Sequence, residues 1–428
     1  MKQLMELLKQ GVSPAHVIDY VKRELVDANG FRELNLDDAF SDENGMFLEE
    51  QGNYYVNLYD TNAVAFRVGS HISDKPMFRI VMAHSDYPCF RIKPNPMVKG
   101  NHATKLNVEL YGGMNQKSWL DRPLGVAGTI IVKGEDAFSP RRVLYRSDRA
   151  LCIIPSLAIH MDRDLNKKGE LDVAKELVPL TALLEEMDLI NVITEAISVD
   201  VTDILDYDLF LYNMDEATIC GIDSSMLAAP KLDNLTSVAA MLEGIIACEK
   251  VPDNTIDVMV VFDNEEVGSL SKQGADSELL TMVLDKILKS LKGQDSTLAD
   301  VVTSSFLLSV DVAHAHHPNY EEKSDATNKA YMGKGFSIKR SVAQKYGTTA
   351  TTAAVVIQIC QDNQIPYTTA INKTGIAGGS TLGPIVSSHL PFPCADIGMP
   401  ILAMHSALEL GAVADYDALK RFLQAFYA

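Results

Sequence analysis

Short apolar runs alternate with helical patterns along most of the chain. Compact apolar runs bounded by polar residues are typical of buried strands, whereas apolar residues at every third or fourth position predict helices. The runs that we interpret as buried strands are 78–84, 256–263, 306–311 and 400–405. Helical spacing recurs over 234–249 and 350–363. This alternation predicts an α/β fold.

The stretch from about 95 to 225 has a different character. Residues 105–113, 128–134 and 142–147 read as sheet and hairpin segments, and a strongly charged segment covers 160–177. We interpret this stretch as a second, mainly β domain inserted into the first. The prediction assigns 1–94 and 226–428 to one domain and 95–225 to the other.

The first 25 residues predict an amphipathic helix. Glu6 interrupts the apolar run, and no cleavage-site pattern follows, so we do not expect a signal peptide. No apolar stretch reaches the roughly 18 residues that a membrane-spanning helix needs. We therefore expect no membrane partner.

The composition is that of an ordinary soluble globular protein, with a strong acidic bias. The 428 residues include 38 basic and 57 acidic ones, which gives a formal net charge of −19. That balance disfavours nucleic acid and anionic membranes as partners. None of the six cysteines forms a CxxC pair, so we expect reduced thiols and a cytoplasmic protein.

Residues able to bind metal recur where the predicted strands and helices begin or end. Any one of them alone is more often structural than a ligand, but their conjunction favours a shared site. In open α/β sheets, ligands bind beyond the carboxyl ends of strands, so residues distant in sequence can converge there. The candidates are His84, Asp233, Glu265, Glu266, Asp311 and His405.

Two imidazoles and several carboxylates suit zinc, with cobalt or manganese as alternatives. Four carboxylates exceed what one tetrahedral zinc needs, which favours two metals that share a carboxylate and activate a water. The acidic stretch at 263–266 by itself allows two interpretations: a solvated acidic loop, or acids held together by a cation. Together, the pattern predicts a metal-dependent hydrolase.

Other catalytic motifs are absent from the sequence. There is no phosphate loop, dinucleotide fingerprint, HExxH or nucleophile elbow. A glycine-rich segment that includes Gly378, Gly379 and Ser380 is a candidate for holding a ligand backbone. A simple tight turn explains it equally well.

Eight segments in a fixed order carry a family resemblance. They are AHSDYPCFRIKPNP, GGMNQKSWLDRPLGVAG, IPSLAIHMDR, LDNLTS, FDNEEVGS, SVDVAHAHHPNY, GGSTLGPI and DIGMPILAMHS. Together they resemble the M18 metallopeptidases, the aspartyl aminopeptidase family, over nearly the whole chain. The resemblance implies a central mixed sheet flanked by helices, of the di-zinc peptidase type, with an inserted dimerisation or lid domain.

The resemblance also implies roles for single residues. His84, Asp233, Glu266, Asp311 and His405 match the family's metal ligands, and Asp233 matches the carboxylate that bridges two metals. Glu265 matches the general base, which takes a proton from the attacking water. Asp86 matches the acid that orients the first histidine. We also expect a cis peptide bond between Asp233 and Asn234.

His160, in the inserted domain, matches a histidine that reaches the active site of a neighbouring subunit and stabilises the oxyanion. The resemblance therefore implies that a dimer is the minimal active unit. It further implies a tetrahedral dodecamer with internal active sites.

The substrate implied is a peptide with a free N-terminus that begins with Asp or Glu. Lys339 matches the family's pocket lysine, although an ordinary exposed lysine is the alternative. The segments INKTGIAGGST and QKYGTTATT depart from the usual family pattern near this pocket. Three alternatives therefore stay open: preference for neutral N-terminal residues, a di-zinc amidase or deacylase of acylated amino acids, and a silent peptide-binding scaffold.

Overall fold

The chain folds into two compact units. A computed structural model describes residues 1–37, 40, 48–167, 169–184, 187–292, 296–376 and 378–428. Unit 1 consists of Met1–Asp86, Ala217–Met404 and Glu409–Ala428. Unit 2 consists of Tyr87–Glu216 and His405–Leu408. The predicted boundaries stood at 94/95 and 225/226, and the two units divide earlier in the chain at both places.

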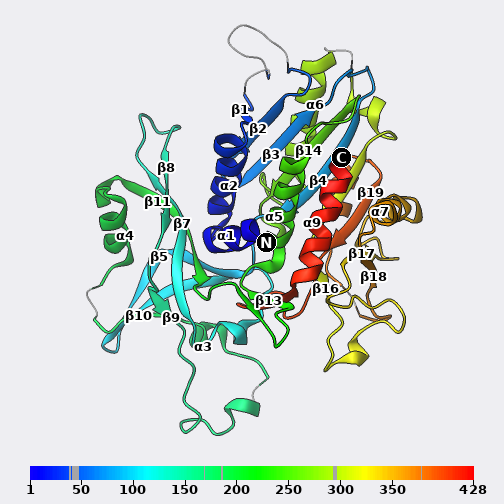
Figure 1. Cartoon of the computed structure of the whole chain (residues 1–428). Helices are drawn as coiled ribbons and strands as arrows, with labels where there is room; N and C mark the ends of the chain where they lie inside the picture. Colours follow the sequence, from blue (N-terminus) through cyan, green and yellow to red (C-terminus); the bar gives the residue numbers. More distant parts are fainter. Residues whose placement is uncertain (38–39, 41–47, 168, 185–186, 293–295, 377) are drawn as a thin grey trace. The chain divides into compact units, whose positions relative to one another are not determined.

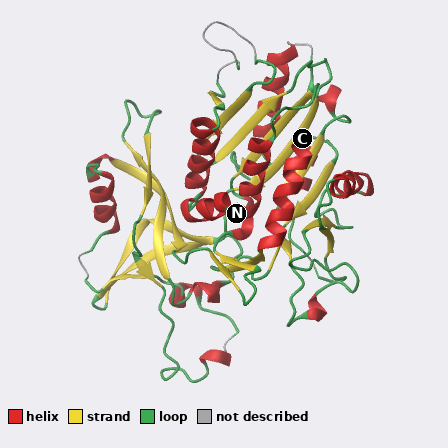
Figure 2. Cartoon of the chain, in the orientation of Figure 1, coloured by secondary structure: helices red, strands yellow, loops and turns green. Residues whose placement is uncertain are grey.

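A nine-stranded mixed sheet forms the centre of unit 1 (Figures 1 and 2). In spatial order its strands are β1 (Arg32–Leu34), β2 (Asn53–Leu58), β3 (Asn62–Val68), β14 (Thr255–Phe262), β4 (Met77–His84), β15 (Phe306–Val310), β19 (Cys394–Gly398), β17 (Phe336–Arg340) and β18 (Tyr367–Ile371). β14, β4, β15 and β19 run parallel to one another, so their carboxyl ends lie at the same edge. This edge is where a site is expected in an open sheet.

Helices cover both faces of this sheet, because its central strands are apolar on both sides. In β14, Met259 and Val261 belong to one core cluster, whereas Val258 and Val260 belong to the other. The first cluster includes side chains of α1 (Lys2–Gln10), α2 (Pro14–Lys22), α5 (Leu232–Ala247), α7 (Ala350–Asp362) and α9 (Val413–Tyr427). The second includes side chains of α6 (Leu279–Lys292) and α8 (Leu382–His389). The predicted α/β fold with a central mixed sheet is confirmed.

Two sequence predictions within unit 1 are wrong in detail. The first 25 residues form two helices instead of one, because Ser13 caps α2 with its side chain and Pro14 begins it. The predicted strand 400–405 contains only β20 (Pro400–Ile401), which pairs with β16 (Ala313–His314). The main-sheet strand in this region is β19, which precedes it.

A smaller sheet in unit 1 joins segments from either side of the inserted residues. It contains β12 (Thr218–Cys220), β13 (Met226–Ala229) and β21 (Glu409–Ala412), and all pairings within it are antiparallel. β21 therefore brings Glu409 beside the strand that leads into α5.

Unit 2 is built around a seven-stranded antiparallel sheet that closes on itself. In spatial order the strands are β11 (Ile204–Asn213), β5 (Cys89–Gly100), β6 (Ala103–Tyr111), β10 (Leu180–Ala182), β9 (Cys152–Ile153), β7 (Pro123–Val132) and β8 (Arg141–Arg146). The additional pairing of β11 with β7 closes the sheet. The short helix α3 (Val173–Glu176) and α4 (Leu189–Ile197) complete the helices of this unit among the described residues. The prediction of an inserted, mainly β domain is confirmed.

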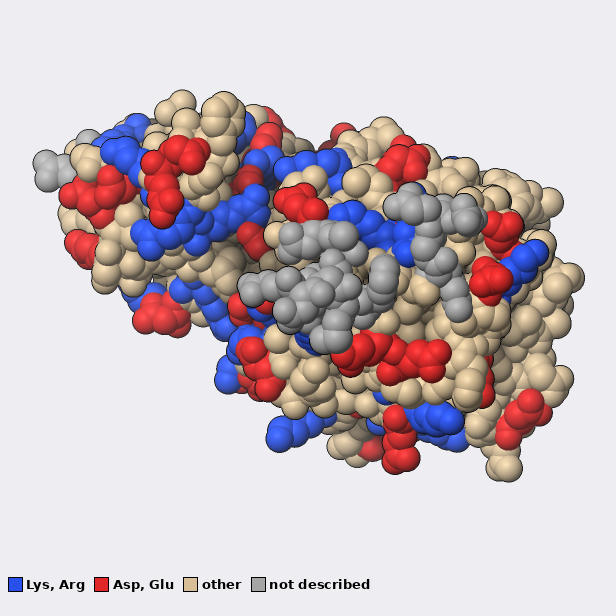
Figure 3. All heavy atoms as spheres, turned by 90° about the horizontal axis from the view of Figure 1, so that it is seen from above, with Lys and Arg blue, Asp and Glu red and all other residues tan. Residues whose placement is uncertain are grey.

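Charged side chains of both signs are distributed over the surface. On the face drawn in Figure 3, Asp and Glu side chains alternate with Lys and Arg side chains, and neither sign covers that face. No helix among the described residues is both long and apolar enough to cross a membrane.

Candidate metal centre

Three neighbouring parallel strands deliver acidic and imidazole side chains to one edge of the main sheet. His84 is the last residue of β4 and lies opposite Phe262, the last residue of β14. A 3-10 turn at Glu265–Val267 follows β14 and presents two glutamates. Asp311 directly follows β15. The convergence expected from the strand ends is therefore present in unit 1.

Asp233 joins this group from the start of α5. The backbone leaves helical geometry at Asp233, and the Asp233–Asn234 peptide bond is cis, as predicted from the resemblance. The amide N–H of Asp233 donates to Oε2 of Glu409 at 3.0 Å, and both side chains are buried. Glu409 holds this backbone segment, a role that sequence reasoning missed. An acid inside the apolar stretch ALELGAV was the available signal.

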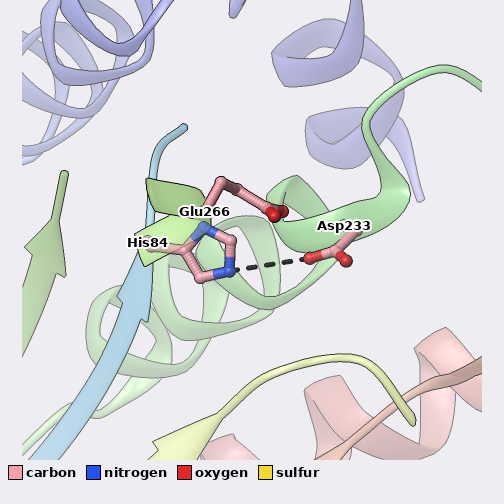
Figure 4. A group of neighbouring side chains, drawn as sticks. All are labelled: His84, Asp233 and Glu266. Atoms are coloured by element: carbon pink, nitrogen blue, oxygen red, sulfur yellow. Dashed lines mark ion pairs between the residues drawn. The ribbon is translucent and has the colours of Figure 1, made fainter. Parts of the chain in front are cut away.

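The imidazole of His84 is surrounded by carboxylates. Its Nε2 lies 3.5 Å from Oδ1 of Asp233, 3.7 Å from Oδ1 of Asp311 and 4.0 Å from Oε2 of Glu265. Ligand atoms of His84, Asp233 and Glu266 all lie within 4.8 Å of one another. Figure 4 shows these three side chains, with His84 and Asp233 joined by the ion pair. One small volume thus collects one imidazole and four carboxylates.

Asp86 connects His84 to the glutamate turn. Its Oδ1 lies 3.3 Å from Nδ1 of His84, whose Nδ1 also lies 3.1 Å from the Asp86 carbonyl oxygen. Since a carbonyl only accepts, Nδ1 carries the proton and Nε2 faces the carboxylates. The backbone N–H groups of Glu265 and Glu266 donate to the two Asp86 carboxylate oxygens, each at 3.1 Å. One carboxylate therefore fixes both the ring and the turn.

Burial of so many acids shifts their proton affinities upward. Burial, reinforced by neighbouring carboxylates, raises the pKa of Glu265 to about 7 even though His84 opposes the shift. Burial and Asp233 raise the pKa of Glu266 well above its ordinary value. Burial lowers the pKa of His84, but hydrogen bonds with Asp311 and Asp86 outweigh it and raise that pKa. Without another cation, protons must relieve the repulsion between these groups.

A divalent metal fits this donor set better than protons do. The donors are oxygen and nitrogen atoms, the combination that zinc accepts. The histidine is oriented by a carboxylate from behind, the arrangement typical of metal-binding histidines. His84, Asp233, Glu266 and Asp311 therefore form a candidate metal centre, with Glu265 beside it.

Lys339 is buried beside this centre, which excludes the alternative of an ordinary exposed lysine. Its Nζ donates to the carbonyl oxygen of Val312 at 2.9 Å and lies 3.4 Å from Oδ2 of Asp311. It also lies 4.9 Å from the centre of the Tyr346 ring. A cavity of about 340 Å³ opens beside Lys339 and Tyr346.

Asp396 is a second buried acid that sequence reasoning missed. It pairs with Lys339 in the backbone register of β19 and β17. Its carboxylate accepts hydrogen bonds from the Gly347 amide and from the Thr381 hydroxyl, both at 2.6 Å. It therefore anchors the loop before α7 and the start of α8. The signal was an acid within the buried stretch CADIG.

The glycine-rich segment has fewer contacts among the described residues. The Ser380 hydroxyl donates to the Lys345 carbonyl at 3.4 Å. A Cβ at Gly378 would lie 2.0 Å from Nδ2 of Asn372, so this position has room only for glycine. Gly379 is exposed and has open space around it. Asn372 lines the cavity beside Lys339.

Two predicted site residues belong to unit 2. His405 adopts a left-handed backbone conformation, with φ of 64°, and its Nδ1 lies 2.9 Å from the Gly113 carbonyl oxygen. That contact places the proton on Nδ1 of the neutral ring. His160 is exposed, in a turn where the Met161 amide donates to the Ala158 carbonyl at 2.8 Å. The three-residue group around His84 does not include either histidine.

Comparison with known proteins identifies the family. The family model described as aminopeptidase I zinc metalloprotease (M18) matches residues 7–427. An M18 family aminopeptidase 2 of Clostridium acetobutylicum is 37% identical over 432 residues, covering 100% of this chain and 98% of that protein. Its counterpart in Pseudomonas aeruginosa is 36% identical over 434 residues, covering 99% and 97%.

Solved structures agree with this assignment. The chain superimposes on one from a complex of Ape4 and Nbr1 with a TM-score of 0.94 and 27% identity, covering 99% of this chain and 84% of that one. A Saccharomyces mature Ape1 dodecamer gives a TM-score of 0.85 at 23% identity, covering 100% and 95%, and supports the fold alone. The chain is therefore a member of the M18 aminopeptidases, a family of zinc metalloproteases.

Proposed function

We propose that this metallo-aminopeptidase releases acidic residues from the N-terminus of peptides, with two zinc ions per subunit. The observation that carries the proposal is the convergence of four carboxylates on the buried His84, at the carboxyl ends of adjacent strands. A pair of Lewis-acidic ions bound there would polarise the scissile carbonyl and activate water. His84, Asp233, Glu266, Asp311 and His405 would hold the ions.

Glu265 is the proposed general base. Its pKa of about 7, raised by burial, suits a group that must gain and lose a proton near neutral pH. It would take a proton from the attacking water and deliver it to the leaving amine. Asp86 would keep it in place through the hydrogen bond from the Glu265 amide to its carboxylate.

The acidic preference rests on Lys339 and on the cavity beside it. Lys339 is buried next to the centre, where a carboxylate side chain of the first residue could pair with a cation in a region of low dielectric. Gly378, Gly379 and Ser380 are proposed to hold the peptide backbone. These assignments set the specificity, whereas the metal centre sets the reaction.

The proposed active form is an oligomer, at minimum a dimer, and a tetrahedral dodecamer by analogy with the Ape1 assembly. His160 would reach the neighbouring subunit's active site and stabilise the oxyanion. Its exposure suits this role, and so do its exposed apolar neighbours Ile159 and Met161. All six cysteines are unpaired, in keeping with the proposed cytoplasmic location.

Turnover of matched dipeptides tests this function. Peptides beginning with Asp, Glu, Leu, Ala and Lys, each with and without N-acetylation, are assayed with zinc, cobalt or manganese. We expect fastest cleavage after Asp and Glu, and none after acetylation. Faster cleavage of Leu or Lys peptides would refute the acidic preference. Cleavage of acetylated substrates alone would favour a deacylase.

A further inference from the structure

The cavity beside Lys339 has a charge opposite to that of the chain. Its described lining contains four lysines and a single carboxylate, although the whole chain has a net charge of −19. These residues are Lys323, Lys329, Lys339, Lys373 and Asp325. A hollow lined with cations in an otherwise acidic protein indicates an anionic ligand.

Two of the four ammonium groups are already engaged. Lys339 donates to the Val312 carbonyl and pairs with Asp311, so a ligand carboxylate would have to compete for it. Lys373 donates to the carbonyl oxygen of Glu322 at 2.5 Å. Neither lysine offers an uncommitted charge to a substrate.

The single carboxylate of the lining is also committed. Oδ1 of Asp325 accepts hydrogen bonds from the side chain and the backbone amide of Asn328, both at 2.9 Å. These bonds, with one from the Thr327 amide, lower the pKa of Asp325 to about 2. Asp325 shapes the loop as an acceptor and has no ion pair with a lysine among the described residues.

Lys329 is the half-buried cation that remains. Among the residues that the structure describes, its ammonium has no hydrogen bond or ion pair, and its side chain is partly shielded from solvent. Both neighbours in sequence are fixed, Asn328 by Asp325 and Ala330 by its carbonyl, which accepts from the His316 amide at 2.8 Å. Lys323 also lines the cavity but is exposed, so solvent and salt screen its charge more strongly.

We infer that Lys329 is a specificity-determining residue that binds the side-chain carboxylate of an N-terminal glutamate, while Lys339 mainly positions Asp311. This inference rests on the proposed aminopeptidase function. The cavity volume of about 340 Å³ equals that of about ten waters, which is more than an aspartate side chain fills. The longer glutamate can reach past Lys339, whose donors are already used, to a cation that has no competing partner.

The test compares kcat/KM for two dipeptides that differ only in charge, one beginning with Glu and one with Gln. It uses the zinc-loaded full chain and the variants Lys329→Met, Lys329→Arg and Lys339→Met. Lys334→Met is the matched control, because Lys334 is an exposed lysine nearby that lines neither described cavity. The Glu-to-Gln ratio removes general effects of folding and metal content.

We expect Lys329→Met to lower the Glu-to-Gln ratio about tenfold, the effect of losing one charge-assisted contact. Lys329→Arg and Lys334→Met should keep the wild-type ratio, and Lys339→Met should lower kcat for both peptides alike. A wild-type ratio in Lys329→Met would overturn the inference, as would a ratio that collapses only in Lys339→Met. Failure of the wild type to cleave either peptide would instead overturn the proposed function, and this inference with it.

Discussion

Asp86 offers the sharpest single perturbation of the metal centre. Its carboxylate is buried, accepts one backbone N–H from each of Glu265 and Glu266, and orients His84 through Nδ1. In Asp86→Asn, the side-chain shape is kept, but the charge and one acceptor oxygen are lost. The new amide N–H group must also face a backbone N–H donor or the histidine.

The expected loss follows from these contacts. Replacing a partner that orients a metal-binding histidine costs about 10- to 100-fold in metal affinity, or roughly 1.4 to 2.8 kcal/mol. The two backbone contacts add to that, because they fix the turn that carries the proposed base. We therefore expect zinc affinity to fall at least tenfold, and kcat/KM to fall with it.

The chain contains a matched control for this variant. Oδ2 of Asp253 lies 3.3 Å from Nδ1 of His71, the same distance as in the buried pair, but both side chains are exposed. Exposed pairs contribute about 0–1 kcal/mol, so Asp253→Asn should bind zinc as the wild type does. Competition with a chelator measures both affinities, and circular dichroism checks the fold. Zinc affinity of Asp86→Asn within twofold of the wild type would refute the reasoning.

Four further predictions follow from the same contacts. Glu265→Gln should lower kcat by about 10²- to 10⁴-fold while zinc content stays at the wild-type level; loss of zinc together with activity would contradict its role as base. Because the pKa of Glu265 is raised to about 7 and that of Glu266 is raised further, zinc binding should release protons and tighten as pH rises; calorimetry in buffers of different ionisation enthalpy measures the release, and a value of zero would count against the charge balance. Asp415, whose pKa burial raises to about 6 despite hydrogen bonds from the Gly333 and Gly335 amides, stabilises the fold most below about pH 4 and loses that contribution as pH rises to 6; the unfolding free energy of the wild type relative to Asp415→Asn in urea should fall by about 3 kcal/mol over this range, and a constant difference would disprove it. Mixed oligomers of His160→Ala and Glu265→Gln subunits should recover part of the activity that each lacks alone, because some sites then combine a wild-type base with a neighbour's histidine; mixtures as inactive as the parents would exclude a role across subunits.

The strand ends of the site could be predicted because the sequence marks them plainly. An apolar run that stops at His84, and another that stops before two glutamates, can be placed in one sheet by length and pattern alone. Their convergence then follows from parallel pairing. The family resemblance added the separate roles of Glu265 and Glu266, which periodicity cannot distinguish.

Other features depend on tertiary contacts that leave a weak mark in sequence. Asp396 and Glu409 are buried acids that hold loops and a helix start, and in the sequence they look like any strand-edge polar residue. Lys339 shows the same difficulty, because its burial arises from the packing of β17 against β19. The strand predicted at 400–405 failed because apolar composition continued beyond Ile401, where pairing in the described β20 ends.

Anomalous X-ray scattering from crystals of the zinc-loaded protein tests the central claim most directly. The account predicts two peaks at the zinc edge in each subunit, with Asp233 between them and with His84, Glu266, Asp311 and His405 as the remaining protein ligands. A single peak, or peaks away from the carboxyl ends of β4, β14 and β15, would contradict the dinuclear centre proposed for this chain.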